Sequence, residues 1–83
     1  MRILVVEDEF KLIELIENRL KKENYFVDLS FDGEVGLYSR LTNIYDLIII
    51  NVMLPLKDGF SILKELRDKK IYSSVIMLIA RTQ

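Results

Sequence analysis

The stretch that most constrains the fold is residues 46–60, where a short apolar run leads directly into a polar turn and an amphipathic segment. Residues Leu47–Ile50 are all large and apolar, and the last three are β-branched. A run this short and branched is typical of a strand buried on both faces, as in a parallel sheet. The run ends at Asn51, and in open α/β sheets ligands bind outside the carboxyl ends of the strands. We therefore expect a site at Asn51.

The rest of the chain alternates short apolar runs with segments of helical periodicity. We expect strands over residues 2–6, 25–30, 46–51 and 75–79, and helices over about 9–22, 34–42 and 59–69. The order is β-α-β-α-β-α-β with short loops, which predicts an α/β fold: a doubly wound parallel sheet with helices on both faces.

Acidic residues stand where two of these helices should begin. Asp8 precedes the first helix and Asp58 precedes the third, and a carboxylate at an N-cap accepts a hydrogen bond from a free backbone N–H. In the second helix, Val35, Tyr38 and Leu41 recur on one side.

Composition excludes several classes of function. The 83 residues form one small domain, and a net charge of −1 gives no electrostatic reason to bind nucleic acid or an anionic membrane. The absence of cysteine and histidine removes disulfides, thiolate metal sites and imidazole chemistry. The uncharged stretches 47–56 and 71–80 are too short to span a membrane. We expect a cytoplasmic protein without membrane or nucleic-acid contacts from this chain.

Three strand ends carry the residues of interest. Glu7 and Asp8 follow the first strand, Asn51 ends the third and Ile79 ends the fourth. If the sheet order is 2-1-3-4, the first and third strands are neighbours at the switch point, and their polar side chains meet in one pocket. Paired acids and a backbone carbonyl are the hard oxygen ligands that Mg²⁺ prefers.

Several segments, in their order and spacing, carry a family resemblance: residues 2–9, 32–33, 45–55, 58–60, 63–67 and 75–81. With them, the chain resembles the receiver domain of bacterial two-component response regulators, in the branch with a winged-helix DNA-binding output. The resemblance covers the whole chain and implies a flavodoxin-like fold and a phosphorelay function. In that family, an aspartate ending the third strand takes a phosphoryl group from a histidine kinase beside Mg²⁺.

Carried over by this resemblance, the metal positions are Glu7, Asp8, Asn51 and the backbone carbonyl of Met53. The phosphoacceptor position holds Asn51, and the position whose hydroxyl contacts the phosphoryl group holds Ile79. An amide has no anionic oxygen to attack phosphorus, and isoleucine has no hydroxyl. We therefore expect no catalytic residue, no enzyme activity and no phosphorylation, with Mg²⁺ binding weak or absent and function exerted through protein–protein contacts.

The resemblance also implies that residues 1–83 are the N-terminal part of a receiver-like domain, without its fifth strand, that strand's lysine, its last two helices or an output domain. The apolar residues of the first, third and fourth strands are then expected to be partly uncovered. The fourth strand becomes a bare sheet edge, and such edges pair with other chains. We expect self-association through this strand or the uncovered sheet face.

Two alternatives remain open. One is an active receiver that has been engineered at its acceptor or truncated, although Ile79 argues against engineering alone. The other is a small nucleotide- or flavin-binding α/β protein, which is disfavoured because Gly33, Gly36 and Gly59 form no phosphate-cradling loop after the first strand. Asp58 as a substitute acceptor is a weaker reading than Asp58 as a helix cap.

Overall fold

Seven elements alternate along residues 1–79, the part of the chain that the computed structural model describes. The elements are β1 (Arg2–Val6), α1 (Phe10–Lys22), β2 (Phe26–Ser30), α2 (Gly33–Thr42), β3 (Leu47–Asn51), α3 (Gly59–Asp68) and β4 (Ser74–Leu78). All four strands are parallel in the order β2-β1-β3-β4, as predicted, and every predicted boundary agrees to within one residue. No helix within residues 1–79 has the length and apolar character needed to cross a membrane.

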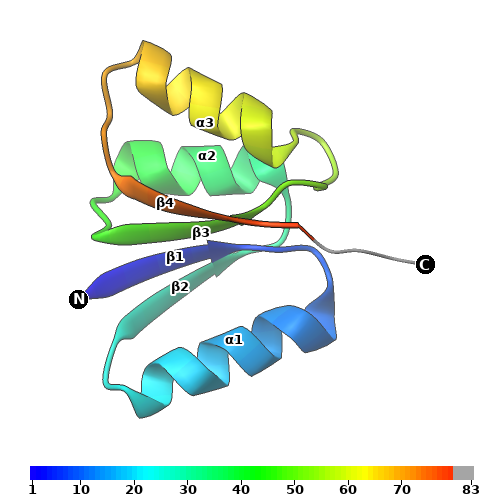
Figure 1. Ribbon diagram of the computed structural model, residues 1–83, viewed down its shortest axis with the longest axis vertical. Helices are drawn as coiled ribbons and strands as arrows, with labels where there is room; N and C mark the ends of the chain where they lie inside the picture. The colour runs from blue at the N-terminus through cyan, green and yellow to red at the C-terminus, as the bar shows by residue number, and fades with distance from the viewer. Residues whose placement is uncertain (80–83) are drawn as a thin grey trace.

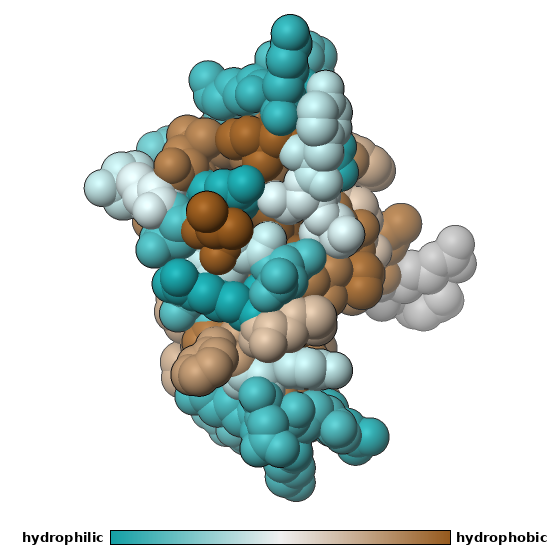
Figure 2. Space-filling view, turned by 90° about the vertical axis from the view of Figure 1, so that its left-hand side faces the viewer, coloured by the Kyte–Doolittle hydropathy of each residue, from teal (hydrophilic) through white to brown (hydrophobic). Residues whose placement is uncertain are grey.

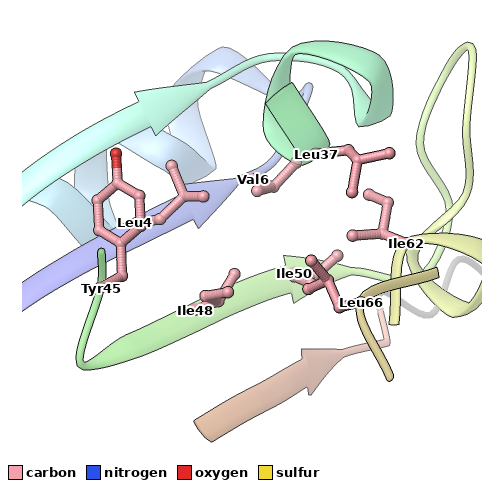
Figure 3. Packing of buried hydrophobic residues seen from close by; sticks show 8 residues of the cluster. All are labelled: Leu4, Val6, Leu37, Tyr45, Ile48, Ile50, Ile62 and Leu66. Atoms are coloured by element: carbon pink, nitrogen blue, oxygen red, sulfur yellow. The ribbon is translucent and has the colours of Figure 1, made fainter. Parts of the chain in front are cut away.

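The sheet lies between two helical layers, with α2 and α3 on one face and α1 on the other (Figure 1). The inner strands β1 and β3 are buried on both faces, which explains why each reads as a continuous apolar run. One core cluster fills the space between the sheet, α2 and α3 (Figure 3). Its buried members are Leu4, Val6, Leu37, Tyr45, Ile48, Ile50, Ile62 and Leu66. The other cluster joins Ile3, Val5 and Ile49 to Ile13 of α1.

Helix α1 covers more of its face of the sheet than we expected. The prediction that the first strand is partly uncovered is wrong, because Ile3 and Val5 are fully buried under α1, and Ile49 of β3 is only 8% exposed. The outer strands are less covered: Phe26 of β2 is 75% exposed and Ile76 of β4 is 48% exposed. Figure 2 shows apolar surface across the middle of the molecule, whereas the upper and lower ends of that view are hydrophilic.

The caps of the helices correct one prediction and confirm another. Asp8 does not cap α1, because the helix begins at Phe10 and its N-cap is therefore Glu9, whose carboxylate accepts from the Leu12 backbone N–H at 3.2 Å. Asp58 caps α3 as predicted.

Helix α2 presents a different side to the sheet from the one marked by its periodic apolar residues. Val35, Tyr38 and Leu41 are exposed, while Leu37 joins the core. Gly36 permits this orientation, because a Cβ at that position would lie 2.7 Å from a methyl carbon of Val6.

A polar cluster closes the amino end of the sheet. The Tyr45 hydroxyl, seen pointing towards β2 in Figure 3, donates to Asp28 Oδ2 at 2.7 Å, and Arg2 Nη2 donates to the same oxygen at 2.9 Å. The Arg2 guanidinium lies over the Tyr45 ring, with Cζ 5.0 Å from the ring centroid. Burial, together with the hydrogen bond to Asp28, raises the pKa of Tyr45 to about 12, and that same bond lowers the pKa of Asp28.

Candidate functional site

The sheet order places the ends of β1 and β3 side by side. Val6 pairs with Ile50 in the parallel register, so the next residues, Glu7 and Asn51, leave the sheet at the same edge. Their side chains touch: Asn51 Nδ2 donates to Glu7 Oε1 at 2.6 Å. The predicted meeting of these two residues is therefore confirmed.

A continuous series of hydrogen bonds runs through this pair. The Met53 backbone N–H donates to Asn51 Oδ1 at 3.1 Å, and the Glu9 backbone N–H donates to Glu7 Oε2 at 2.7 Å. A backbone N–H can only donate a hydrogen bond, so the Asn51 side-chain atom that faces the Met53 N–H must be the amide oxygen. The amide nitrogen is thereby directed at Glu7, which fixes the orientation of the Asn51 side chain.

The pair is almost completely removed from solvent. Glu7 is 0% exposed and Asn51 is 5% exposed. Burial raises the pKa of Glu7, while the hydrogen bonds from Glu9 and Asn51 oppose that rise because they stabilise the charged carboxylate. Within residues 1–79, every buried side-chain nitrogen and oxygen of the protein has a hydrogen-bond partner.

The other predicted site residues lie on the surface around this pair. Asp8 is exposed and lines an open groove of ≈ 690 Å³ together with Met53 and Phe60. Met53 is 75% exposed. Ile79 is 71% exposed and follows the end of β4, which pairs with β3 through Leu78 and Asn51. The structure thus joins Glu7 to Asn51 and leaves Asp8 and Ile79 at the rim.

These residues, as they are arranged, do not fit a bound Mg²⁺. Magnesium needs oxygen ligands that turn towards it in near-octahedral geometry. Both Glu7 oxygens instead accept N–H groups, Asn51 Oδ1 accepts from Met53, and the side of Asn51 that faces Glu7 is a donor. Across residues 1–79, no three histidine, cysteine, aspartate or glutamate side chains are grouped as a metal site.

The segment between β3 and α3, residues 52–58, is tied to its surroundings by backbone contacts. Gly59 N–H donates to the Val52 carbonyl at 2.8 Å, and Gly33 N–H donates to the Pro55 carbonyl at 3.1 Å. A Cβ on Gly33 would lie 1.7 Å from the Lys57 carbonyl oxygen, so only glycine permits this approach. The segment therefore packs directly against the start of α2.

Reasoning from the sequence missed two groups that complete the site. Glu9 supplies the backbone donor to Glu7, and Gly33 allows the 52–58 segment to approach α2. The sequence carried a signal for Gly33, which belongs to an Asp-Gly turn, but none for Glu9, because glutamate is not among the residues that favour an N-cap. The predicted role of Met53 rests on its carbonyl, whereas the contact seen here is made by its N–H.

A parallel sheet of order 2-1-3-4, with its polar pair at the switch between β1 and β3, defines a flavodoxin-like α/β protein. The chain belongs to the response regulator receiver domain family, whose model matches residues 3–83.

Relatives and solved structures agree with this assignment. The chain is 45% identical over 83 residues to the transcriptional regulatory protein DltR of Streptococcus agalactiae, all of this chain matching 37% of that protein. The receiver domain of the Francisella response regulator 1452 superposes with a TM-score of 0.93 at 35% identity, over 99% of this chain and 68% of that one. The response regulator TrrA of Thermotoga maritima, solved in complex with Mg²⁺-BeF, gives a TM-score of 0.90 at 36% identity, over 98% of this chain and 70% of that one.

Proposed function

We propose that this chain is a receiver-like module of a two-component phosphorelay response regulator that cannot accept a phosphoryl group and acts through protein–protein contacts. The observation that carries the proposal is Asn51: it stands at the end of β3, and its side-chain amide is occupied on both sides by Glu7 and Met53. The acceptor position of the family is therefore filled by a group that is neither anionic nor free.

The chemistry of phosphoryl transfer supports this view. The nucleophile must present an oxygen lone pair in line with the phosphorus, and catalysis comes from positioning and charge stabilisation. The amide oxygen of Asn51 is neutral and accepts a hydrogen bond from Met53, and Ile79 offers no hydroxyl to the phosphoryl group. We assign no catalytic residue and no enzyme activity to this chain.

We propose that Mg²⁺ binding is weak or absent. The family's ligand positions correspond to Glu7, Asp8, Asn51 and the Met53 carbonyl. The response regulator TrrA, which this chain resembles, was solved in complex with Mg²⁺-BeF. Here Asp8 is the one predicted carboxylate at the surface, because Glu7 is buried and its oxygens face N–H groups. One exposed carboxylate holds Mg²⁺ poorly.

The wider setting follows from the relatives. DltR is named a transcriptional regulatory protein, so we propose that the parent of this chain is a cytoplasmic DNA-binding regulator and that its upstream partner is a histidine kinase. We assign residues 1–83 to the N-terminal part of the receiver domain, since they match 68% of the Francisella receiver. DNA contacts would then come from an output domain and not from these residues.

Intact mass spectrometry after incubation with acetyl phosphate and MgCl₂ tests the proposal. We expect no phosphoryl adduct on this chain, while a receiver with aspartate at the acceptor position, treated in parallel, gains one. An adduct on this chain, at Asp8, Asp58 or elsewhere, would overturn the proposal, and peptide mapping would locate it.

We also propose that the chain self-associates through β4. Within residues 1–79 this strand is hydrogen-bonded on one side only, to β3, and Ile76 is 48% exposed beside that edge. Size-exclusion chromatography with light scattering at micromolar concentration should show a dimer or larger species. Ile76→Lys should shift it towards monomer, whereas Ile44→Lys, at a 79% exposed position outside the strands, should not. A sharp monomer peak for the unmodified chain would contradict this proposal.

A further inference from the structure

We infer that the Asn51 carboxamide replaces a bound cation as the group that holds the carboxyl ends of β1 and β3 together, so that the pocket keeps one arrangement without metal. The group that faces the buried Glu7 carboxylate is the amide nitrogen of Asn51, an N–H donor at 2.6 Å, and such a donor cannot coordinate Mg²⁺. This replacement of a cation goes beyond the missing phosphoacceptor, because a receiver could lose phosphorylation and still need a cation here.

The first step is electrostatic. Glu7 is fully buried, and a buried carboxylate is costly unless it is paired or hydrogen-bonded. With aspartate at position 51, a second carboxylate would lie against Glu7, and like charges at this distance disfavour each other's ionised form unless a cation lies between them. With asparagine, the amide nitrogen donates to Glu7, and position 51 adds no further negative charge to the neighbouring carboxylates of Glu7 and Asp8. The amide thus supplies the compensation that a divalent ion would otherwise provide.

The second step is mechanical. The Glu7–Asn51 contact connects three parts of the chain: the N-terminus of α1 through the Glu9 N–H, the end of β3, and the segment 52–58 through the Met53 N–H. That segment leads into α3, whose first residue, Gly59, is bonded back to the Val52 carbonyl. The position of the segment relative to the sheet therefore depends on hydrogen bonds within the protein, and adding or removing Mg²⁺ leaves it unchanged.

Thermal unfolding followed by circular dichroism, in EDTA and in millimolar MgCl₂, tests the inference on the whole chain and two Asn→Asp variants. Asn51→Asp should lower the unfolding midpoint in EDTA by roughly 5 °C or more, because it places two carboxylates together in a buried site. MgCl₂ should raise the midpoint of this variant. The unmodified chain and the control Asn18→Asp, at an exposed position of α1, should respond to MgCl₂ by less than about 1 °C.

A third variant separates charge from lost hydrogen bonds. Asn51→Ala removes both side-chain contacts and adds no carboxylate, so its midpoint should fall and stay insensitive to MgCl₂. If Asn51→Asp does not fold in EDTA, its recovery of helical ellipticity on adding MgCl₂ supports the inference in the same way.

Three results would overturn the inference: stabilisation of the unmodified chain by MgCl₂, an unchanged midpoint for Asn51→Asp in EDTA, or a response of Asn51→Ala equal to that of Asn51→Asp. None of them depends on phosphorylation, so a phosphoryl adduct on another carboxylate would refute the proposed function and leave this inference standing.

Discussion

Removing the Tyr45 hydroxyl tests how the amino end of the sheet is held. Tyr45→Phe keeps the buried ring beneath the Arg2 guanidinium but deletes the donor that lies 2.7 Å from Asp28 Oδ2. Asp28 keeps its bond from Arg2, and its side chain is 45% exposed, so water replaces part of the lost interaction. A hydrogen bond to a charged group under these conditions contributes about 1–2 kcal/mol. We expect Tyr45→Phe to lose that amount near neutral pH.

The same substitution has a distinctive alkaline signature. The pKa of Tyr45 is about 12 in the folded chain against an ordinary value of 10.0 for tyrosine, so folding favours the protonated hydroxyl. Its contribution is complete below the unfolded pKa and is lost as pH rises from the unfolded towards the folded value. A difference of this size corresponds to roughly 3 kcal/mol. The stability advantage of the unmodified chain over Tyr45→Phe should therefore shrink above the unfolded pKa and reverse near the folded one.

Urea unfolding of both proteins across the neutral and alkaline range, read by circular dichroism, measures this difference directly. Lysine deprotonation affects both proteins equally and cancels in the comparison. Tyr72→Phe, at a 74% exposed position, is the matched control and should follow the unmodified chain at every pH. A constant difference between the unmodified chain and Tyr45→Phe from neutral to strongly alkaline pH would show that folding does not favour the protonated Tyr45 hydroxyl.

Three further substitutions test the packing and the helix cap by the free energy of urea unfolding. Gly33→Ala should lose about 2 kcal/mol or more, because its Cβ would lie 1.7 Å from the Lys57 carbonyl oxygen; unchanged stability would show that the segment 52–58 yields freely. Asp58→Ala should lose about 1 kcal/mol with the cap of α3; no loss would mean that the cap is replaced by water. Leu66 is fully buried, so Leu66→Ala should lose about 2–5 kcal/mol, whereas Leu15 is 67% exposed and Leu15→Ala should change the stability little. Equal losses of stability would contradict the assigned core.

Much of the fold could be predicted because its signals are strong and local. The inner strands are buried on both faces, so Ile3–Val6 and Ile48–Ile50 read as unbroken apolar runs. Helix α1 has a single apolar side, and α3 begins at a clear cap, Asp58. The meeting of Glu7 and Asn51 then follows from the sheet order alone.

The remaining features depend on tertiary contacts that periodicity does not encode. Helix α2 is apolar on more than one side, and the contact of Gly36 with Val6 decides that Leu37 faces the core while Tyr38 faces solvent. Whether the Asn51 amide turns its oxygen or its nitrogen towards Glu7 depends on the backbone donor of Met53, whose position is set by the turn after β3.

Nuclear magnetic resonance of the uniformly ¹⁵N-labelled chain, with and without MgCl₂, tests whether the Asn51 amide holds the pocket together without a cation. We expect the Asn51 side-chain NH₂ signals to be protected from solvent exchange by the bond to Glu7. These signals and the backbone amides of Glu9 and Met53 should keep their chemical shifts when MgCl₂ is added. Rapid exchange of the Asn51 NH₂ group, or a saturable shift of the Glu9 and Met53 amides with MgCl₂, would contradict this expectation.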